Sequence, residues 1–493
     1  MECILAIDQG TTGSRAVLYR RDGTIQSYSY REFAQRFPHP GWVEHDPVDI
    51  WDCVVGCVRD VLGHAPRPTI ASIGISNQRE TVVAWDADTS EPLHNAIVWQ
   101  CRRTAERCAQ LNADERVARA IRSTTGLPVD PYFSATKFEW LLQNVPAVEQ
   151  AAIRGTLRLG TIDSWLIWKL SAGSAHATDY TNAARTMLFD IDRLCWSDDL
   201  VSLFGLPPSA LPRVSGSMET LAVSAGGSRI LSGIPIAGVA GDQQSALFGQ
   251  GCFAPGTAKN TYGTGAFVLM NAGERRPKGN PHLITTLGCG TSGRPVYVLE
   301  GAIFAAGAVI QWLRDALNLL DSADVSQQMA EQVDDNGGVY FVPALAGLGA
   351  PYWDSGARGM ITGITRGTKK QHVVRAALES VCFRTRDVID AMVEVAGFPL
   401  TELRIDGGAS ANDFVCQFQA DLLNASVVRP RDIETTVRGA AYLAGLGVGF
   451  WHDVSELEGT VAIERVFAPS MPQDQRERLY SEWTRAVRRA LCA

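Results

Sequence analysis

Short apolar runs of strand length alternate along the chain with longer runs of helical period, and this alternation predicts an α/β fold. The stretch 5–19 combines a strand, a glycine- and hydroxyl-rich turn and a second strand. The stretch 72–86 indicates two strands joined by a polar elbow. The stretch 233–251 indicates a strand that ends at Gly241 and Asp242 and leads into a helix.

The later part of the chain continues the same alternation. In 403–423 a predicted strand reaches a glycine pair and then a helix, while 94–100 closes an apolar run with a tryptophan. Further helices are predicted over 159–170, 300–315, 435–451 and 473–492.

A second glycine turn, Thr261–Gly265, separates two apolar segments in the way that Gly10–Ser14 does near the beginning of the chain. This faint internal similarity predicts two related lobes. We expect the lobes to comprise residues 1–250 and 251–493, with the boundary within 245–258.

Composition narrows the functional classes. A chain of 493 residues is too long for a single core, and its formal net charge of −8 supplies no broad attraction for nucleic acid or for an anionic membrane. No basic segment followed by a long apolar stretch opens the sequence, and no apolar run reaches the roughly 18 residues of a membrane span. We therefore expect a cytoplasmic protein without stable membrane insertion.

The eleven cysteines are dispersed, without a CxxC pair, which favours reduced thiols. Cys53 and Cys57 stand one helical turn apart, but no second ligand pair accompanies them. Simple packing is therefore the favoured interpretation over metal binding.

The turn Gly10–Gly13 has the chemistry of a phosphate cradle, because glycines let backbone N–H groups approach an anion and threonine hydroxyls add donors. It has neither the Lys-Ser/Thr ending of a Walker loop nor the helix that follows a Rossmann motif directly. A purely structural hairpin remains an alternative. Asp8 favours the phosphate interpretation, since a carboxylate beside phosphate calls for a bridging Mg²⁺; a turn-capping role is its alternative.

Three glycine turns, at 10–13, 263–265 and 407–408, each follow a predicted strand and could converge on one nucleotide. This arrangement resembles the actin-like (ribonuclease H-like) ATPase fold. The resemblance implies two α/β lobes facing each other across a cleft, each with a phosphate hairpin, and an adenosine pocket in the second lobe.

Several stretches together make the resemblance more specific. They are “IDQGTTGSRA”, “GWVEHDPVDIW”, “SNQRET”, “NAIVWQCRRT”, “DPYFSATK”, “GVAGDQQSALFGQ”, “KNTYGTGAF” and “IDGGASANDF”. In wording and order they resemble the FGGY family of carbohydrate kinases from residue 4 to about 451, and within it the members that phosphorylate glycerol. The resemblance implies ATP-dependent phosphorylation of glycerol to sn-glycerol 3-phosphate, with Mg²⁺ as cofactor.

The resemblance also assigns roles around the polyol. Asp242 matches the general base that takes the proton of the attacking hydroxyl. Residues that match ligands of the glycerol hydroxyls or carbons are Arg79, Glu80, Trp99, Tyr132, Asp242, Gln243 and Phe267. Such a polar set suits a small triol, whose selectivity must come from paired donors and acceptors.

On the nucleotide side, the resemblance implies one residue set from each lobe and a shared metal. The matching positions are Thr11, Thr12 and Arg15 at the first hairpin, Gly263 and Thr264 at the second, and Gly307, Gln311, Gly408 and Asn412 around the ribose and adenine. Asp8 and Asp242 would share the Mg²⁺ environment. Since the ligands come from both halves, we expect the lobes to close over the substrates.

Structural alternatives exist for individual residues. Asp242 could be a helix N-cap, the dipeptide Arg79-Glu80 a surface ion pair, and Trp99 and Phe267 core residues. Two rival functions also remain open. One is an FGGY kinase for a pentulose, a tetritol or dihydroxyacetone, and the other is a non-catalytic ATP-binding sensor.

Regulation departs from the pattern of related bacterial enzymes. In 224–238 Arg229 is displaced from a fructose 1,6-bisphosphate loop, and no histidine occurs between 187 and 281 for phosphorylation. We therefore expect neither control. Val437-Arg438 replaces a common Ala-Leu, which could alter helix packing or a contact in the expected homo-oligomer, a dimer or tetramer.

Overall fold

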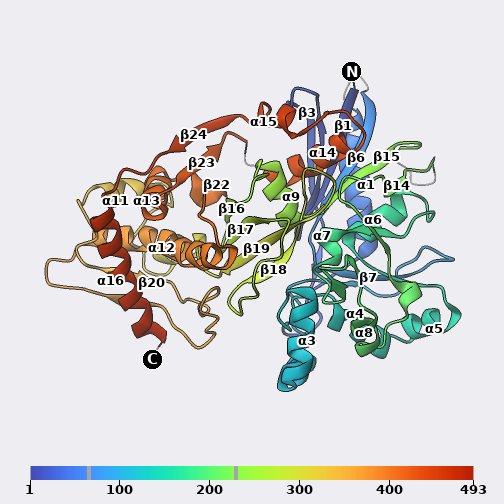
Figure 1. Ribbon diagram of the computed structural model, residues 1–493, viewed down its shortest axis with the longest axis horizontal. Coiled ribbons are helices and arrows are strands. Elements are labelled where there is room, and N and C mark those ends of the chain that lie inside the picture. The colour runs from blue at the N-terminus through green and yellow to red at the C-terminus, as the bar shows by residue number, and fades with distance from the viewer. Residues whose placement is uncertain (1, 64–67, 227–230, 433, 492–493) are drawn as a thin grey trace.

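The computed structural model describes residues 2–63, 68–226, 231–432 and 434–491. Within these ranges two large β-sheets with helices on their faces form the two halves of the molecule, the first at the right and the second at the left of Figure 1. The predicted α/β class is therefore confirmed.

The first sheet has the strand order β14-β15-β6-β1-β2-β3. Strands β15, β6 and β1 are parallel, whereas β2 is antiparallel to both β1 and β3. The strands span Glu2–Gln9 (β1), Gly13–Tyr19 (β2), Ile25–Glu32 (β3), Thr69–Asn77 (β6), Ala222–Val223 (β14) and Pro235–Gly241 (β15). The predicted turn at 10–13 is thus the tip of the β1–β2 hairpin.

The second sheet repeats this design. Its order is β18-β19-β17-β16-β22-β23-β24, and the run β19-β17-β16-β22-β23 has the same strand directions as β3-β2-β1-β6-β15. The strands span Thr257–Tyr262 (β16), Ala266–Gly273 (β17), Ile284–Gly288 (β18), Val296–Ile303 (β19), Glu402–Gly407 (β22), Ser426–Pro430 (β23) and Ile463–Phe467 (β24). The two glycine hairpins therefore occupy equivalent places in two related sheets.

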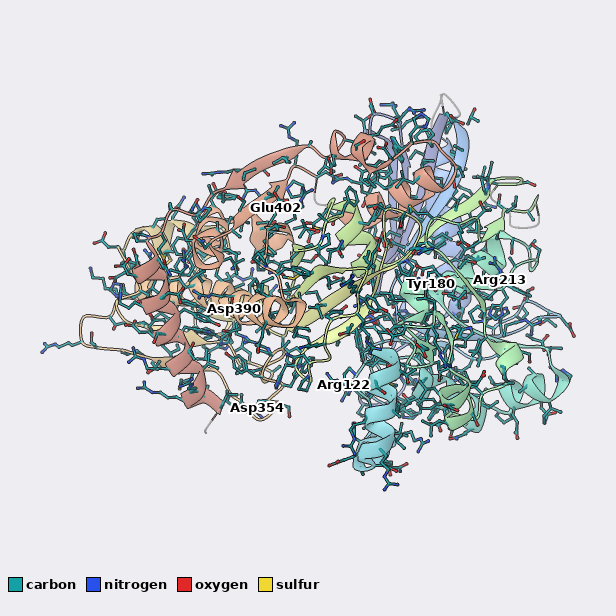
Figure 2. All side chains as sticks on the ribbon, in the orientation of Figure 1. Arg122, Tyr180, Arg213, Asp354, Asp390 and Glu402 are labelled. Atoms are coloured by element: carbon teal, nitrogen blue, oxygen red, sulfur yellow. The ribbon has the colours of Figure 1, made fainter. Side chains whose placement is uncertain are left out.

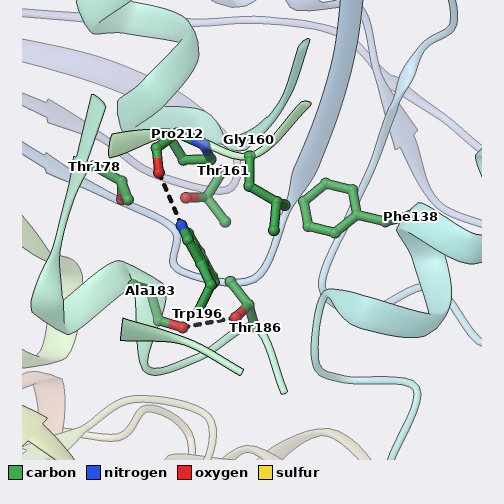
Figure 3. Close-up of a pocket in the computed structure, with 9 residues that line it drawn as sticks. Phe138, Gly160, Thr161, Thr178, Ala183, Thr186, Trp196 and Pro212 are labelled. Atoms are coloured by element: carbon green, nitrogen blue, oxygen red, sulfur yellow. Dashed lines mark hydrogen bonds between the residues drawn. The ribbon is translucent and has the colours of Figure 1, made fainter. Parts of the chain in front are cut away.

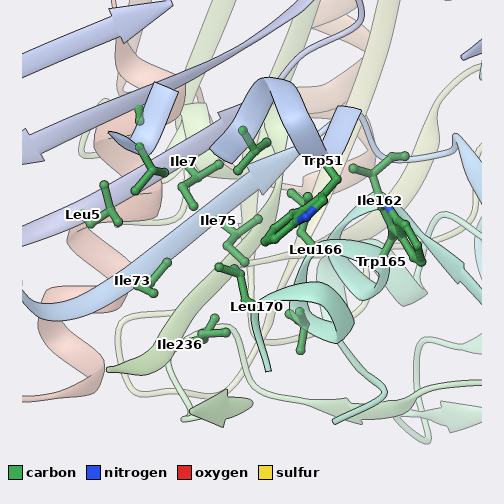
Figure 4. Close-up of a cluster of buried hydrophobic side chains, with 14 of the residues drawn as sticks. Leu5, Ile7, Trp51, Ile73, Ile75, Ile162, Trp165, Leu166, Leu170 and Ile236 are labelled. Carbon is green, nitrogen blue, oxygen red and sulfur yellow. The ribbon is translucent and has the colours of Figure 1, made fainter. Parts of the chain in front are cut away.

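Helices cover both faces of the first sheet. On one face, α1 (Pro47–Gly63) and α6 (Ile162–Leu170) pack Trp51 and Leu166 against Leu5 and Ile75 (Figure 4). The opposite face carries α14 (Thr435–Gly447), from the far end of the chain. The alternation of the strands explains these two layers, because successive side chains of β1 point to opposite faces.

Helix α9 (Asp242–Gly249) lies between the two sheets. Phe248 joins the cluster of α14 and the first sheet, while Leu247 packs against Leu269 and Val298 of the second. The far face of the second sheet is covered by α12 (Lys370–Ala396) and α13 (Asp413–Leu423). Beyond them lie α10 (Gly307–Asp315), α11 (Val325–Glu331) and α16 (Gln473–Leu491). None of the described helices is both long and apolar enough to cross a membrane.

An additional layer of the first lobe consists of a sheet in the order β4-β5-β8-β7-β9 with helices around it. Its strands are Gln35–Arg36 (β4), Glu44–His45 (β5), Val82–Asp86 (β7), Ala96–Ile97 (β8) and Leu157–Thr161 (β9). Its helices are Ala105–Ala113 (α2), Glu115–Thr125 (α3), Ala135–Asn144 (α4), Pro146–Arg154 (α5) and Asp198–Leu203 (α8). Arg122 of α3 donates to the carbonyls of Asn280 and Leu283 at 2.9 and 3.2 Å, which ties this layer to the second lobe (Figure 2).

The remaining elements are short. The small paired strands are Ala177–Asp179 (β10) with Arg213–Ser215 (β13), Phe189–Asp190 (β11) with Cys195–Trp196 (β12), and Tyr340–Val342 (β20) with Met360–Thr362 (β21). The remaining helical turns are Tyr180–Ala183 (α7), Pro208–Ala210 (η1), Gly408–Ala411 (η3) and Val454–Glu458 (α15).

Two predicted helices contain strands at their beginnings. The segment 159–170 starts within β9 and becomes helical only at Ile162, and 300–315 starts within β19 and becomes helical only at Gly307. Both strands are buried, and a buried strand and a buried helix both appear as a continuous apolar run. The two strands predicted in 72–86 exist, but β6 and β7 belong to different sheets.

Candidate active site

The carboxyl ends of three parallel strands meet at one edge of the first sheet. The register aligns Gln9 of β1 with Asn77 of β6, and Asn77 with Gly241 of β15. This edge therefore carries Asp8 at the end of β1, Arg79 and Glu80 after β6, and Asp242 after β15. In α/β sheets this is the edge at which ligands bind.

Arg79 is the centre of a buried polar network, with 2% of its side chain exposed. Its Nε lies 3.2 Å from Oδ1 of Asp242 and 3.5 Å from Oε1 of Glu80. Its Nη2 donates to the hydroxyl of Tyr132 at 3.2 Å, and its Nη1 donates to Oε1 of Gln244 at 3.3 Å. Arg79 and Glu80 are therefore no surface ion pair, and three of the predicted polyol ligands surround one guanidinium.

Two charged residues that the sequence analysis did not identify complete this network. Glu300 of β19 accepts hydrogen bonds from Arg79 Nη1 at 2.6 Å and from Arg185 Nη2 at 3.1 Å, and Arg185 Nε donates to Glu80 at 2.7 Å. Burial opposes the charge on Glu300, but Arg185 and Arg79 outweigh it and hold the pKa of Glu300 down at about 2. The second lobe thus places a carboxylate between two arginines of the first.

Asp242 is the first residue of α9, and 34% of its side chain is exposed. The N-cap position belongs to Gly241, so Asp242 is not the N-cap of the helix, although its Oδ1 accepts the backbone N–H of Gln243 at 2.7 Å. Partial burial of the carboxylate raises its pKa to about 6, with Glu80 and Asp8 adding to the rise and Arg79 opposing it. At neutral pH such a carboxylate is mostly ionised and can accept a proton.

Gln243 contacts a buried lysine of the second lobe. Lys259 of β16 has no exposed surface, and its Nζ donates to Oε1 of Gln243 and to Oγ1 of Thr261, the latter at 2.9 Å. Burial lowers the pKa of Lys259, while Asp406 and Asp242 act in the opposite direction. Lys259 is thus a third charged residue near the site, after Glu300 and Arg185, that the sequence did not reveal.

Trp99 and Tyr132 form an aromatic corner beside Arg79. Their rings pack edge to face with centroids 5.6 Å apart, and the indole N–H of Trp99 donates to Oγ1 of Thr11 at 3.0 Å. Behind them, buried Lys137 donates to the carbonyls of Tyr132 and Glu80 at 2.6 and 3.0 Å. The corner therefore connects the first glycine hairpin with the predicted polyol ligands.

Phe267 lies on the second sheet, where no contact with Trp99 or Arg79 is found among the described interactions. It stands opposite Thr261 and Ala302 in the register of β17, on the sheet face that also carries Lys259 and Glu300. Its nearest apolar neighbours include Leu247 and Leu269 of a small buried cluster. Phe267 thus faces the same side as the charged residues, as part of the second lobe.

The second and third glycine turns are neighbours, because β16 and β22 pair in parallel and end together at Tyr262 and Gly407. Gly263 and Thr264 are exposed, and the carbonyl of Gly263 accepts the N–H of Gly307 at 3.0 Å. A side chain at Gly307 would put its Cβ 2.6 Å from that carbonyl oxygen, so the close approach requires glycine. Gly408 is exposed beside this turn.

The remaining nucleotide candidates differ in how free their side chains are. Gln311 is exposed on α10. Asn412 caps α13 by accepting the N–H of Val415 at 3.1 Å, and it donates to Ser326 at 3.3 Å. The side chain of Asn412 therefore serves as a helix cap in this structure, and its place near adenine stays a prediction.

Asp8 is buried at the end of β1 and has two partners. Ser76 Oγ donates to its Oδ1 at 2.6 Å, and Nε of Arg15 lies 3.3 Å from its Oδ2. Arg15 also pairs with Glu434, so two carboxylates contact its guanidinium. The Thr12 hydroxyl is 3.5 Å from that of Tyr30. Burial raises the pKa of Asp8, against the effects of Arg15 and Ser76.

No cluster of three or more His, Cys, Asp or Glu side chains that could hold a metal alone occurs among the described residues. A divalent cation bound with a nucleotide needs only one or two carboxylates, because phosphate oxygens and water supply the other ligands. Asp8 and Asp242 lie at the same sheet edge, where Asp8 adds to the rise in the pKa of Asp242, and their role as metal ligands stays a prediction.

The remaining sequence expectations have plain structural outcomes. The thiols of Cys53 and Cys57 are buried and donate to the backbone carbonyls of Arg31 and Ser14, both at 3.2 Å. Arg229 lies outside the described residues.

Val437 and Arg438 are both buried under the first sheet. Val437 belongs to the cluster of α14, and Arg438 pairs with Asp432 at 2.5 Å. Both residues therefore take part in the packing of α14, and an effect on an oligomer contact stays a prediction.

A small pocket elsewhere in the first lobe is separate from these residues. Trp196 and Phe138 border it, the indole N–H of Trp196 donates to the carbonyl of Pro212 at 2.9 Å, and none of the predicted site residues lines it (Figure 3). It is therefore no candidate for the polyol site.

Comparison with known proteins identifies the family of the chain. The models of the N-terminal and C-terminal domains of the FGGY family of carbohydrate kinases match residues 3–249 and 258–448. The chain is 53% identical to a glycerol kinase of Symbiobacterium thermophilum over 99% of this chain and 98% of that one. It is 54% identical to a glycerol kinase of Halorhodospira halophila over 99% and 96%, respectively.

Solved structures agree with the sequence relatives. The crystal structure of Plasmodium falciparum glycerol kinase with ADP superposes with a TM-score of 0.94 at 36% identity, covering 100% of this chain and 98% of that chain. Gluconate kinase from Lactobacillus acidophilus, at 23% identity and a TM-score of 0.89 over 100% and 98%, shares the fold. The predicted two-lobed actin-like fold is confirmed, and the chain belongs to the FGGY family of carbohydrate kinases.

Proposed function

We propose that the protein transfers the γ-phosphoryl group of ATP to a terminal hydroxyl of glycerol and releases sn-glycerol 3-phosphate and ADP. The observation that carries this proposal is the contact of Arg79 with Asp242, Glu80 and Tyr132 at the edge of the first sheet. The relatives with more than half of their residues identical are named glycerol kinases, which favours this substrate.

In the proposed reaction Asp242 accepts the proton of the terminal hydroxyl while its oxygen attacks the γ-phosphorus. The bond between the γ-phosphorus and the bridging oxygen breaks, and ADP leaves. Arg79, Glu80, Tyr132 and Gln243 bind the hydroxyl groups. No covalent protein intermediate is required, because positioning and charge neutralisation supply most of the catalysis.

Trp99 and Phe267 complete the proposed polyol site from the two lobes. Their rings would cover the carbon chain of glycerol, and the hydrogen bond of Trp99 to Thr11 connects this cover to the first hairpin. A wrong substrate would leave buried donors or acceptors without partners, which is the costly outcome that gives a polar site its selectivity.

The nucleotide would lie against the glycine turns of both lobes. The phosphates would be bound by Thr11, Thr12 and Arg15 of the first hairpin and by Gly263 and Thr264 of the second. The nucleoside would lie among Gly307, Gln311, Gly408 and Asn412. Asp8 and Asp242 would hold Mg²⁺, which neutralises phosphate charge when it is bound.

We also propose that the two lobes divide at about residue 250.

A coupled assay of ADP release tests the substrate. With ATP and Mg²⁺ present, glycerol should give the highest kcat/KM in a panel that also contains dihydroxyacetone, erythritol and xylulose. A higher kcat/KM with a ketose would reassign the enzyme to another FGGY substrate. ATP binding without turnover of any polyol would instead favour the non-catalytic sensor.

Several sequence expectations stay predictions. A dimer or tetramer would be tested by light scattering, and a cytoplasmic location by cell fractionation. Insensitivity to fructose 1,6-bisphosphate would be tested by adding it to the same assay.

A further inference from the structure

Lys259 is a buried cation that contacts Gln243, the neighbour of Asp242, and the mechanism above does not use it. It projects from β16 of the second lobe towards α9, and no part of it is exposed to solvent. An ammonium group inside a protein needs acceptors to compensate for its lost hydration. Two of these acceptors are Gln243 Oε1 and Thr261 Oγ1.

The contact with Lys259 determines the orientation of the Gln243 amide. An ammonium group only donates hydrogen bonds, so the amide atom that faces it must be the oxygen. The NH₂ end of Gln243 consequently points away from Lys259. In this orientation the side of the Gln243 amide that faces away from Lys259 presents its NH₂ group, which can only donate hydrogen bonds to a ligand.

Lys259 also connects two parts of the site across the lobes. Thr261 precedes the exposed turn at Gly263, and Gln243 follows Asp242 directly. The charges that act on Lys259 are those of Asp406, Asp242 and Glu300, which favour its protonated form, and that of Arg79, which opposes it.

We propose that Lys259 is a positioning residue of the phosphoryl-transfer reaction, which fixes the Gln243 amide so that its NH₂ group donates to an oxygen of the polyol. The inference rests on the proposed function and adds a direction to one contact in it. A substrate must present an acceptor oxygen at that position. Lys259 itself touches neither polyol nor phosphate in this account.

A double-mutant cycle in the full-length protein tests this role. Lys259→Met should raise the KM for glycerol about tenfold, the loss expected for one oriented hydrogen bond, and leave the KM for ATP within about twofold. Gln243→Ala should have a similar effect. The double variant should be no worse than Gln243→Ala alone, because Lys259 acts only through that side chain.

Lys137 provides a matched control. It is an equally buried lysine that holds the carbonyls of Glu80 and Tyr132 rather than Gln243. The effects of Lys137→Met and Gln243→Ala should therefore multiply. Lys259→Gln, which retains an N–H donor, should recover part of the glycerol affinity, and it replaces Lys259→Met in the cycle if that variant does not fold.

Melting temperature and ADP affinity of each variant show whether the fold is intact. If the effects of Lys259→Met and Gln243→Ala on the KM for glycerol multiply, the positioning role is wrong. A large rise in the KM for ATP in Lys259→Met would also overturn it, in favour of a direct contact between Lys259 and phosphate. In both cases the wild type would still phosphorylate glycerol. A wild type that phosphorylates no polyol would overturn the proposed function and the inference that rests on it.

Discussion

At the scale of the residue, the proposed chemistry depends on the charge of Asp242. Its carboxylate is crowded by protein and by the acidic groups of Glu80 and Asp8, and its pKa is raised to about 6. Arg79 limits that rise through the 3.2 Å contact with Oδ1. The same surroundings therefore keep Asp242 ionised at neutral pH and basic enough to receive a proton.

The pH dependence of kcat/KM for glycerol follows from this pKa. Below about pH 6 Asp242 is protonated and cannot act as a base, so the rate should fall with decreasing pH through a midpoint near 6. Initial rates between pH 5 and about 8 measure the midpoint. Melting temperatures over the same interval control for unfolding, and a rate that is unchanged at pH 5 would contradict the assigned base.

Local pattern drew attention to the glycine turns and to the carboxylates Asp8 and Asp242 at strand ends. The resemblance to the FGGY family, and not this pattern, assigned Arg79, Glu80 and Asp242 to one site, and the three side chains do meet. Glu300 was missed because it is a single charge within the apolar strand β19, and Lys259 was missed because it lies among polar residues in the strand β16. A charged residue in a buried strand is rare unless it is paired. The sequence could therefore have indicated that Glu300 and Lys259 have partners, but it could not have said which residues those partners are.

At the scale of the element, α14 shows how a helix from the far end of the chain covers one face of the first sheet. Its small residues, including Ala440 and Ala444, pack against Ile4 and Ala6 of β1. Its periodicity predicted the helix, but the sheet that it covers could not be derived from local pattern. The prediction of a single helix over 300–315 was wrong at its start, because apolar content alone did not distinguish the end of β19 from the beginning of α10.

Overpacking at α14 should destabilise the protein. Ala440 is fully buried, so Ala440→Leu should lower the free energy of unfolding by about 1–3 kcal/mol. The control is Ala120→Leu on α3, where Ala120 is exposed, and it should change the free energy of unfolding by less than about 0.5 kcal/mol. Urea denaturation measures both variants, and equal stability would show that α14 does not pack against the sheet as described.

At the scale of the whole molecule, the Glu300 carboxylate connects the two lobes. It comes from the second sheet and accepts hydrogen bonds from Arg79 and Arg185 of the first lobe, with all three side chains buried. Replacing one member of such a group leaves the others charged and unpaired in a site that water does not reach. The polyol ligands and the contact between the lobes therefore share one network.

Glu300→Gln should cost about 3–5 kcal/mol of folding stability near neutral pH. Because the pKa of Glu300 is lowered to about 2, its stabilising charge is complete above the unfolded pKa near 4.5 and is lost as the pH falls through 2. The difference between wild type and variant should therefore shrink over that interval. Urea denaturation at several pH values measures it, and a constant difference would contradict the charged state of Glu300.

The proposed reaction requires that the carboxylate of Asp242, at the junction of the lobes, accepts the proton of the attacking hydroxyl. The direct measurement is phosphorylation of glycerol by Asp242→Asn under single-turnover conditions, together with its binding of glycerol and ADP. We predict nearly unchanged binding and a transfer rate reduced by about 10²–10⁴-fold. Transfer at the wild-type rate by a variant that binds both ligands would contradict the account.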